Sequence, residues 1–144
     1  MKALAWVIAV LACAPLMADL AQVRAEPNLE RRSRAALDNA ERALKESRRA
    51  YEAGDMKQMA SLLEEIRESV DVADAALKDT HKDPIKSPKH FKNAEIKTET
   101  LLRKLEGFAQ DVNVADRPLV EKVKERVQEV HESLLQGVMV GKKK

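Results

Sequence analysis

Residues 56–78 have the sequence MKQMASLLEEIRESVDVADAALK, and this stretch decides the fold. Its apolar side chains recur three and four positions apart, which puts them on one face of an α-helix and the charged side chains on the other. The positions expected on the buried face are Met59, Leu63, Ile66, Val70, Ala73 and Leu77. The stretch therefore predicts an amphipathic helix that buries one stripe against other helices.

Three further stretches, residues 29–53, 88–112 and 117–140, repeat this spacing. Each predicts a helix with a single apolar stripe. The expected inward positions are Leu37, Ala40, Leu44, Ser47 and Tyr51 in the first, Phe91, Ala94, Thr98, Leu101, Leu105, Phe108 and Val112 in the second, and Val120, Val123, Val127, Val130, Leu134 and Val138 in the third.

The ends of these helices are marked by capping residues. Asn28 and Asp55 are expected to accept hydrogen bonds from unpaired backbone N–H groups, and Gly54 suits the left-handed conformation that ends a helix. Ser87 followed by Pro88 has the pattern of a cap and a first helical residue. Gly107 lies inside the predicted helix over residues 88–112 and weakens it by about 1 kcal/mol relative to alanine. This helix is therefore expected to fray or stop at Gly107.

Each predicted helix would be about 33 Å long at 1.5 Å per residue. Short turns separate the first helix from the second and the third from the fourth. This pattern predicts an all-α domain. The expected architecture is an antiparallel four-helix bundle of two αα-hairpins, with coiled-coil spacing, over residues 26–144. A homo-oligomer, such as two docked hairpins from two chains, is an alternative because further apolar residues lie beside the stripes. These residues are Leu62, Val72, Ile96, Leu102 and Leu119.

Residues 1–25 have the pattern of an export signal. One positive charge at Lys2 precedes an uncharged apolar run over residues 3–18, and Val-Arg-Ala before Glu26 suits signal peptidase. The run is shorter than the roughly 20 apolar residues that cross a bilayer, so cleavage between Ala25 and Glu26 is favoured over a retained anchor. Lipidation at Cys13 is a further alternative. The expected location is therefore periplasmic or extracellular.

The composition of the remaining chain excludes several functions. The whole chain has 26 Lys and Arg residues and 24 Asp and Glu residues, and removing Lys2, Arg24 and Asp19 with the signal leaves 24 and 23. This near balance argues against a general nucleic-acid binder, which would have a clear basic excess. Cys13 is the only cysteine and leaves with the signal, so thiolate metal sites and cysteine nucleophiles are excluded.

No catalytic, cofactor or metal motif is expected. His81, His90 and His131 lack a carboxylate or histidine partner at the three- or four-residue spacing typical of metal sites on helices. The serines show no nucleophile motif. The sequence therefore predicts a protein that is not an enzyme and has no cofactor.

The one surface feature with a candidate role is the basic segment between the second and third helices. Its predicted contacts for an anion or a partner are Lys82, Lys86, Lys89, His90 and Lys92. In an antiparallel bundle the tail Lys142 to Lys144 would lie at the same end. The predicted function is a protein-interaction or structural module of the cell envelope, and the alternative is a binder or carrier of an anionic ligand, a metal or a cofactor.

Overall fold

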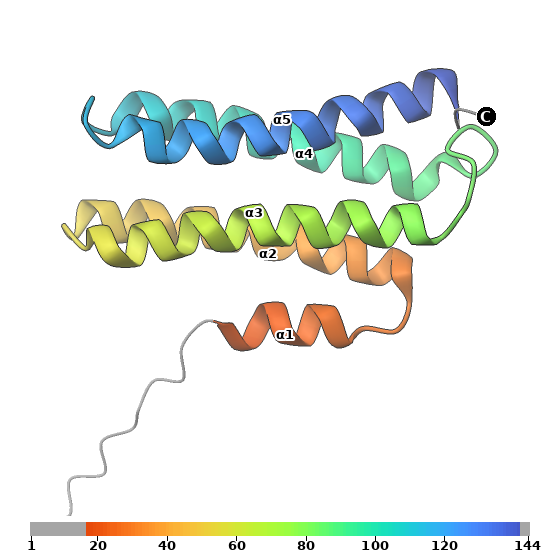
Figure 1. The fold of residues 1–144 in the computed structure, drawn as a ribbon, viewed down its shortest axis with the longest axis horizontal. Coiled ribbons are helices and arrows are strands. Elements are labelled where there is room, and N and C mark those ends of the chain that lie inside the picture. Colours follow the sequence, from red (N-terminus) through yellow and green to blue (C-terminus); the bar gives the residue numbers. More distant parts are fainter. Residues whose placement is uncertain (1–16, 142–144) are drawn as a thin grey trace, which may run out of the picture.

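The computed structural model describes residues 17–141, and these residues form an all-helical bundle without strands (Figure 1). A short helix, α1 (Met17–Ala25), precedes four helices of 24 residues each. These are α2 (Leu29–Glu52), α3 (Met56–Asp79), α4 (Pro88–Asp111) and α5 (Arg117–Val140). The all-α class is confirmed, and each long helix lies within one residue of its predicted bounds.

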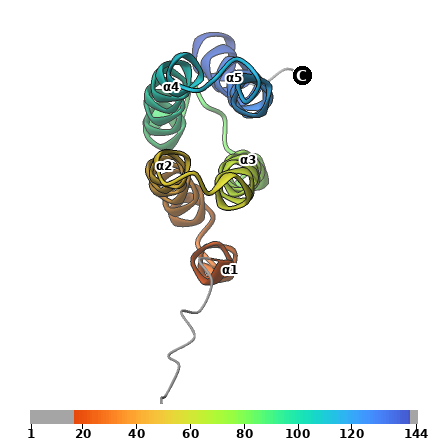
Figure 2. The same cartoon turned by 90° about the vertical axis from the view of Figure 1, so that its left-hand side faces the viewer.

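The four long helices are arranged as two stacked hairpins. In each hairpin the helices are antiparallel, α2 with α3 and α4 with α5 (Figure 1). Seen end on, α4 lies over α2 and α5 lies over α3, and both of these stacked pairs run parallel (Figure 2). The linker over residues 80–87 therefore crosses one end of the bundle diagonally, from α3 to α4. The sequence did not predict this diagonal crossing.

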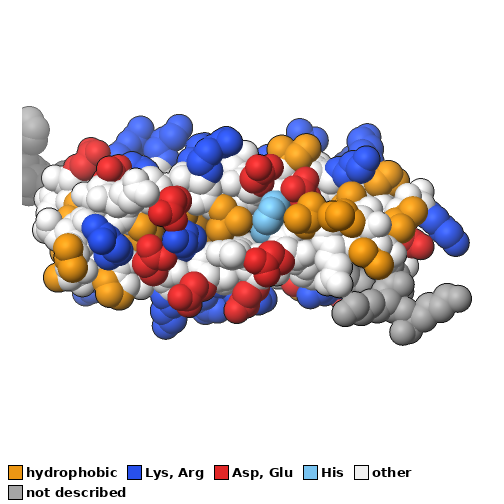
Figure 3. Space-filling model, turned by 90° about the horizontal axis from the view of Figure 1, so that it is seen from above, with side chains coloured by type: hydrophobic (Ala, Val, Ile, Leu, Met, Phe, Trp, Pro, Cys, Tyr) orange, Lys and Arg blue, Asp and Glu red, His pale blue; other side chains and the backbone are white. Residues whose placement is uncertain are grey.

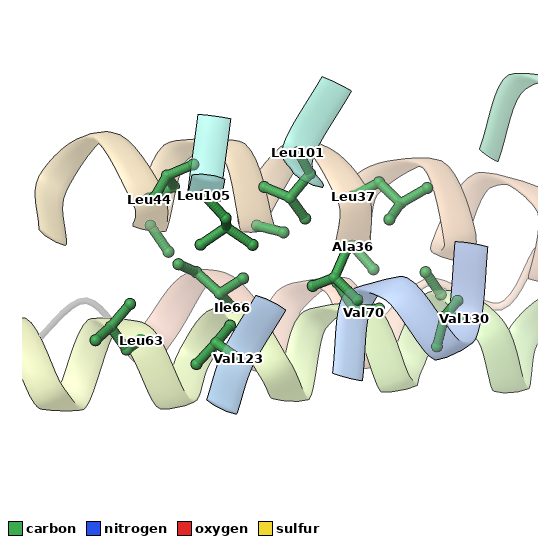
Figure 4. Packing of buried hydrophobic residues seen from close by; sticks show 14 of the residues in the cluster. Ala36, Leu37, Leu44, Leu63, Ile66, Val70, Leu101, Leu105, Val123 and Val130 are labelled. Carbon is green, nitrogen blue, oxygen red and sulfur yellow. The ribbon is translucent and has the colours of Figure 1, made fainter. Parts of the chain in front are cut away.

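The core contains nearly every position that the periodic pattern placed inward. All the predicted positions of α3 and α4 are buried, and Figure 4 shows Leu37, Leu44, Leu101 and Leu105 facing Ile66 and Val70 across the bundle interior. Tyr51 and Val138, at the ends of their stripes, are only partly buried. The three-and-four spacing is thus the pattern that the core uses.

The α2–α3 hairpin has a second buried face that the stripe did not predict. On α2 this face consists of small residues, and the serine Oγ of Ser33 donates a hydrogen bond of 3.0 Å to the carbonyl of Ala73 on α3. A side chain as short as serine reaches a neighbouring helix backbone only where the two helices lie close together. The small buried residues of α2 outside the predicted stripe are Ser33, Ala36, Ala43 and Ala50; Ala40 and Ser47, which belong to the stripe, are buried too.

Most of the predicted helix caps are observed. Asn28 accepts a hydrogen bond from Arg31 N at 2.9 Å, Asp55 accepts one from Gln58 N at 3.0 Å, and Gly54 has a φ of +75°. The prediction for Ser87 was wrong, because its side chain makes no capping hydrogen bond, although Pro88 does begin α4. The backbone N–H of Ser87 instead donates to Asp83 O within the linker.

The prediction that α4 frays or stops at Gly107 was also wrong, since α4 continues to Asp111. Arg48 of α2 lies against this glycine: its guanidinium is 5.1 Å from the Phe108 ring centre and donates to Lys104 O at 3.1 Å. A Cβ at position 107 would lie 3.2 Å from Nη2 of Arg48. The absent side chain lets the arginine approach the helix backbone, and this contact holds the helix where propensity alone would weaken it.

Helix α1 lies outside the bundle, against α2 and α3 (Figure 2). It contributes two buried apolar side chains, Leu20 and Val23, and exposed ion pairs such as Asp19 with Arg42 at 3.4 Å. Its last residue is Ala25, where cleavage is predicted. No helix among residues 17–141 combines the length and apolar character needed to cross a membrane. Residues 1–16, with Cys13, and the tail Lys142 to Lys144 lie outside the described residues.

A polar network lies on α2 and α3 near α1. Asn39 donates to Ser69 Oγ at 2.9 Å and to Glu65 at 3.2 Å, and Arg42 binds the same Glu65 oxygen at 3.1 Å. Arg42 also faces Glu46 as an ion pair at 2.9 Å without hydrogen-bond geometry. The side chain of Glu65 is largely buried in this network.

Candidate functional site

The linker packs against the C-terminal end of α5. Pro84 is buried on Gly137, where a Cβ would lie 3.3 Å from its ring, and Ile85 contacts Gly141. Asp83 supports the turn by accepting a hydrogen bond from Ile85 N at 2.9 Å. Gly141, the last described residue, is therefore close to the linker.

A cavity of about 470 Å³ lies between this linker and the ends of α3, α4 and α5. Its volume falls within the range of about 300–1,000 Å³ that small-molecule sites occupy. The walls are mostly apolar, and the polar groups come from the end of α3, the linker and the outer turns of α5. The lining residues are Asp74, Leu77, Lys78, His81, Lys82, Pro84, Phe91, Ser133, Leu134, Gln136, Gly137, Val140 and Gly141.

Two lysines are held in place in the cavity wall. Lys78 Nζ donates to Asp74 Oδ2 at 2.7 Å, and the side chains of Lys78 and Asp74 are 65% and 11% exposed. Lys82 pairs with Glu30 of α2. An ammonium group has three donors, so each carboxylate positions its lysine and leaves other donors of that lysine for a further acceptor.

Glu30 connects the predicted basic segment to α2. Besides Lys82, its carboxylate faces His90 Nε2 at 3.0 Å. The hydrogen bond from Lys82 holds the pKa of Glu30 below its ordinary value of 4.5, and the positive fields of His90 and Lys82 lower this pKa further, whereas burial opposes the shift. Two of the five predicted contact residues are thus engaged by an acid of another helix.

The structure does not bring the predicted contact residues together into one site. Of the five, only Lys82 lines the cavity. Lys86, Lys89 and Lys92 are exposed around the start of α4, and His90 faces Glu30. Sequence reasoning missed Asp74 and Lys78, which could have been noticed as an acid beside the apolar stripe with a base four residues later.

A hydroxyl, an imidazole and a carboxylate meet between α4 and α5. Thr98 Oγ1 is 2.9 Å from His131 Nδ1, and His131 Nε2 is 3.9 Å from Glu95. Thr98 is fully buried, and its hydroxyl also lies 2.9 Å from the carbonyls of Ala94 and Glu95. These three side chains connect α4 with α5. A nucleophile must reach its substrate, and the buried hydroxyl of Thr98 is not accessible for acyl transfer. Within residues 17–141 no three His, Cys, Asp or Glu side chains are grouped to bind a metal.

Exposed apolar side chains surround the linker end. Met139 and Val140 at the end of α5 are 71% and 67% exposed, and Ile85 of the linker is half exposed. Figure 3 shows hydrophobic side chains among charged ones on the face formed by α4 and α5, with several near this end. Adjacent apolar side chains left in water are typical of a surface that binds another molecule.

These features define the class of the protein as a helical bundle with one amphipathic cavity at its linker end. Comparison of the chain with protein-family models, curated proteins and solved structures finds no match.

Proposed function

We propose that the protein is an exported, non-catalytic four-helix bundle of the cell envelope that acts by binding another molecule at its linker end. The supporting observations are the cavity of about 470 Å³, which Val140 lines, and the exposed apolar side chains of Ile85 and Met139, which follow and precede the lining residues Pro84 and Val140 in the sequence. The first candidate for the bound molecule is a protein partner, which would cover these side chains. The protein would then have an interaction or structural role that requires binding of this partner and no catalysis.

Export is supported by the way α1 is attached. Of the buried residues in the hydrophobic core cluster, α1 contributes only Leu20 and Val23. The surface near α1 carries Asn39, Arg42 and Glu65, the kind of residues that face water well. Cleavage between Ala25 and Glu26 would therefore leave residues 26–144 as a complete antiparallel domain in the periplasm or outside the cell.

A non-catalytic role is supported by the state of the charged groups. Carboxylates near the cavity, such as Glu30 and Asp74, are bound to lysines. Catalytic acids and bases need an accessible proton and a pKa near the working pH. Glu30 has the opposite property, because its lysine partner lowers its pKa.

The second candidate is an anionic ligand, favoured by the two lysines in the cavity wall. Lys78 and Lys82 are at least half exposed, so their ammonium groups are accessible from solvent. A single acidic group that bridges them would gain charge-assisted hydrogen bonds.

Native mass spectrometry of the protein purified from the cells that make it tests this proposal. We expect a mature chain that begins at Glu26, bound to a partner or a ligand, and the same spectrum gives copy number and any lipid. Met139→Asp should release a protein partner, whereas Ile96→Asp, at an exposed apolar position on α4 away from the cavity, should not. A bare monomer that retains residues 1–25 would overturn the proposal.

A further inference from the structure

We infer that the cavity binds a single-chain amphiphile with an acidic head group, its chain between α3, α4 and α5 and its head on Lys78 and Lys82. This inference rests on the proposed binding role of the linker end and names the class of ligand. It follows from three properties of the cavity: its apolar wall, its polar mouth and the arrangement of its charges.

The wall suits a hydrocarbon chain. Leu77, Phe91 and Leu134 are buried residues from three different helices, and Pro84 of the linker closes the side that faces α5. None of these four residues has a polar side chain, so a chain in the cavity would leave water without losing hydrogen bonds. A wholly polar ligand would not gain from this wall.

The mouth suits an acidic head. Lys78 and Lys82 both line the cavity. Asp74, which is also a lining residue, holds the ammonium group of Lys78, and Glu30, which lies outside the lining, pairs with that of Lys82. Because their carboxylate partners already restrict them, these lysines lose less conformational freedom on binding than free lysines would. Ser133 and Gln136 add polar groups on α5. A carboxylate or a phosphate is the complement of this set.

A cationic head is disfavoured by the same geometry. The only acidic side chain in the lining is that of Asp74, which is 11% exposed. Lys78 occupies its Oδ2 at 2.7 Å, and this lysine is 65% exposed. A cationic head would have to displace Lys78 before it reached the carboxylate, whereas an anionic head meets an ammonium group first.

Isothermal titration at low salt, below the micelle concentration of each probe, tests the inference on the full chain. The probes are decanoate and decyl phosphate, which have ten carbon atoms each and differ in the acid, with decanol, decyltrimethylammonium and acetate as comparisons. We expect both acids to bind, and their order identifies the head group. Decanol and decyltrimethylammonium should bind at least about tenfold more weakly, and acetate should give no heat.

Two pairs of variants locate the site. Lys78→Gln should weaken decanoate binding about fivefold, while Lys57→Gln, an exposed lysine at the start of α3, should not change it. Val140→Asp should weaken it about tenfold, because it puts a charge in the wall. Met139→Asp is the matched control, since Met139 is equally exposed and adjacent but does not line the cavity.

Equal binding of all four long-chain probes, or equal effects of the two aspartate variants, would overturn the inference. So would the absence of decanoate binding to a chain whose circular dichroism shows it folded. The failures are distinguishable: if decanoate does not bind but the purified protein carries another partner at the linker end, the binding function stands and only the ligand class is wrong.

Discussion

Gly107 shows how one missing side chain can support a contact between helices. Glycine inside a helix ordinarily costs about 1 kcal/mol relative to alanine. Here an added Cβ would meet Arg48 at 3.2 Å and move the guanidinium from Phe108 and Lys104 O. We therefore expect Gly107→Ala to raise the free energy of unfolding by less than about 0.5 kcal/mol, measured by urea denaturation.

The control is the same substitution in an Arg48→Ala chain. With the guanidinium removed, the alanine should give its full gain of about 1 kcal/mol. Equal gains in the two backgrounds would show that Arg48 does not depend on the glycine.

The same residues show which contacts could not be predicted from the sequence. Helix propensity could identify Gly107 as a weak point, but Arg48 lies 59 positions away along the chain, and nothing local predicts that it packs there. Lys82 and Glu30 are a second example, since the acid that engages the predicted basic segment belongs to another helix. Ser87 makes no capping hydrogen bond with its side chain, and its backbone N–H binds Asp83 O within the linker.

The α2–α3 hairpin depends on small side chains between its helices. Ala43 is completely buried in α2. Overpacking a close interface typically costs about 1–3 kcal/mol, and we expect Ala43→Leu to lower the free energy of unfolding by this amount in urea. Lys45→Leu, at an exposed position two residues later, should change it by less than about 0.5 kcal/mol. A neutral Ala43→Leu would mean that the hairpin is loosely packed.

For helix α1 we expect the opposite result, a small effect on the free energy of unfolding when the helix is removed. Burying Leu20 and Val23 contributes about 1.5–3 kcal/mol each, and the loss of conformational freedom on ordering the helix opposes this gain. A chain that begins at Glu26 should therefore keep its helical circular dichroism and a cooperative melt, with a free energy of unfolding within about 2 kcal/mol of the full chain. Loss of cooperativity would contradict the proposal that α1 is removed.

Whether a buried helix face could be predicted depended on the residue types that form it. Leucine and valine at alternating spacing are easily recognised, so the stripes of α3, α4 and α5 were predicted. Alanine and serine are neither clearly apolar nor clearly polar in such a pattern, so the second face of α2, with Ala36 and Ala43, was not. The cavity could not be predicted, because the linker and three helices form it and no single segment carries its signal.

The ion pairs that connect helices make the whole molecule sensitive to acid. Glu30 joins α2 to the linker, and its pKa lies below 4.5 because of its hydrogen bond to Lys82. Glu106 of α4 has a lowered pKa chiefly through its hydrogen bond from Lys124 of α5. A lowered carboxyl pKa means that the stabilisation is present above the ordinary value and is lost as the pH falls through the folded value.

We therefore expect the urea midpoint to fall as the pH drops from about 6 to about 3, and to fall less in Glu30→Gln. The control is Glu125→Gln, at an exposed position on α5, for which the drop should equal that of the unaltered chain. The same drop in Glu30→Gln would show that the linker ion pair does not stabilise the fold. Each pair is partly exposed to solvent, so its contribution is small and salt should reduce it.

The diagonal linker is the one covalent connection between the two hairpins. Cleavage of the backbone at the exposed residue Lys86 would remove no residue from the apolar interior. The halves would then become two complementary peptides, and their reassembly would depend on concentration. The same topology allows two chains to exchange halves, so reciprocal swapping is the form of dimer that this architecture permits with the least change to its packing.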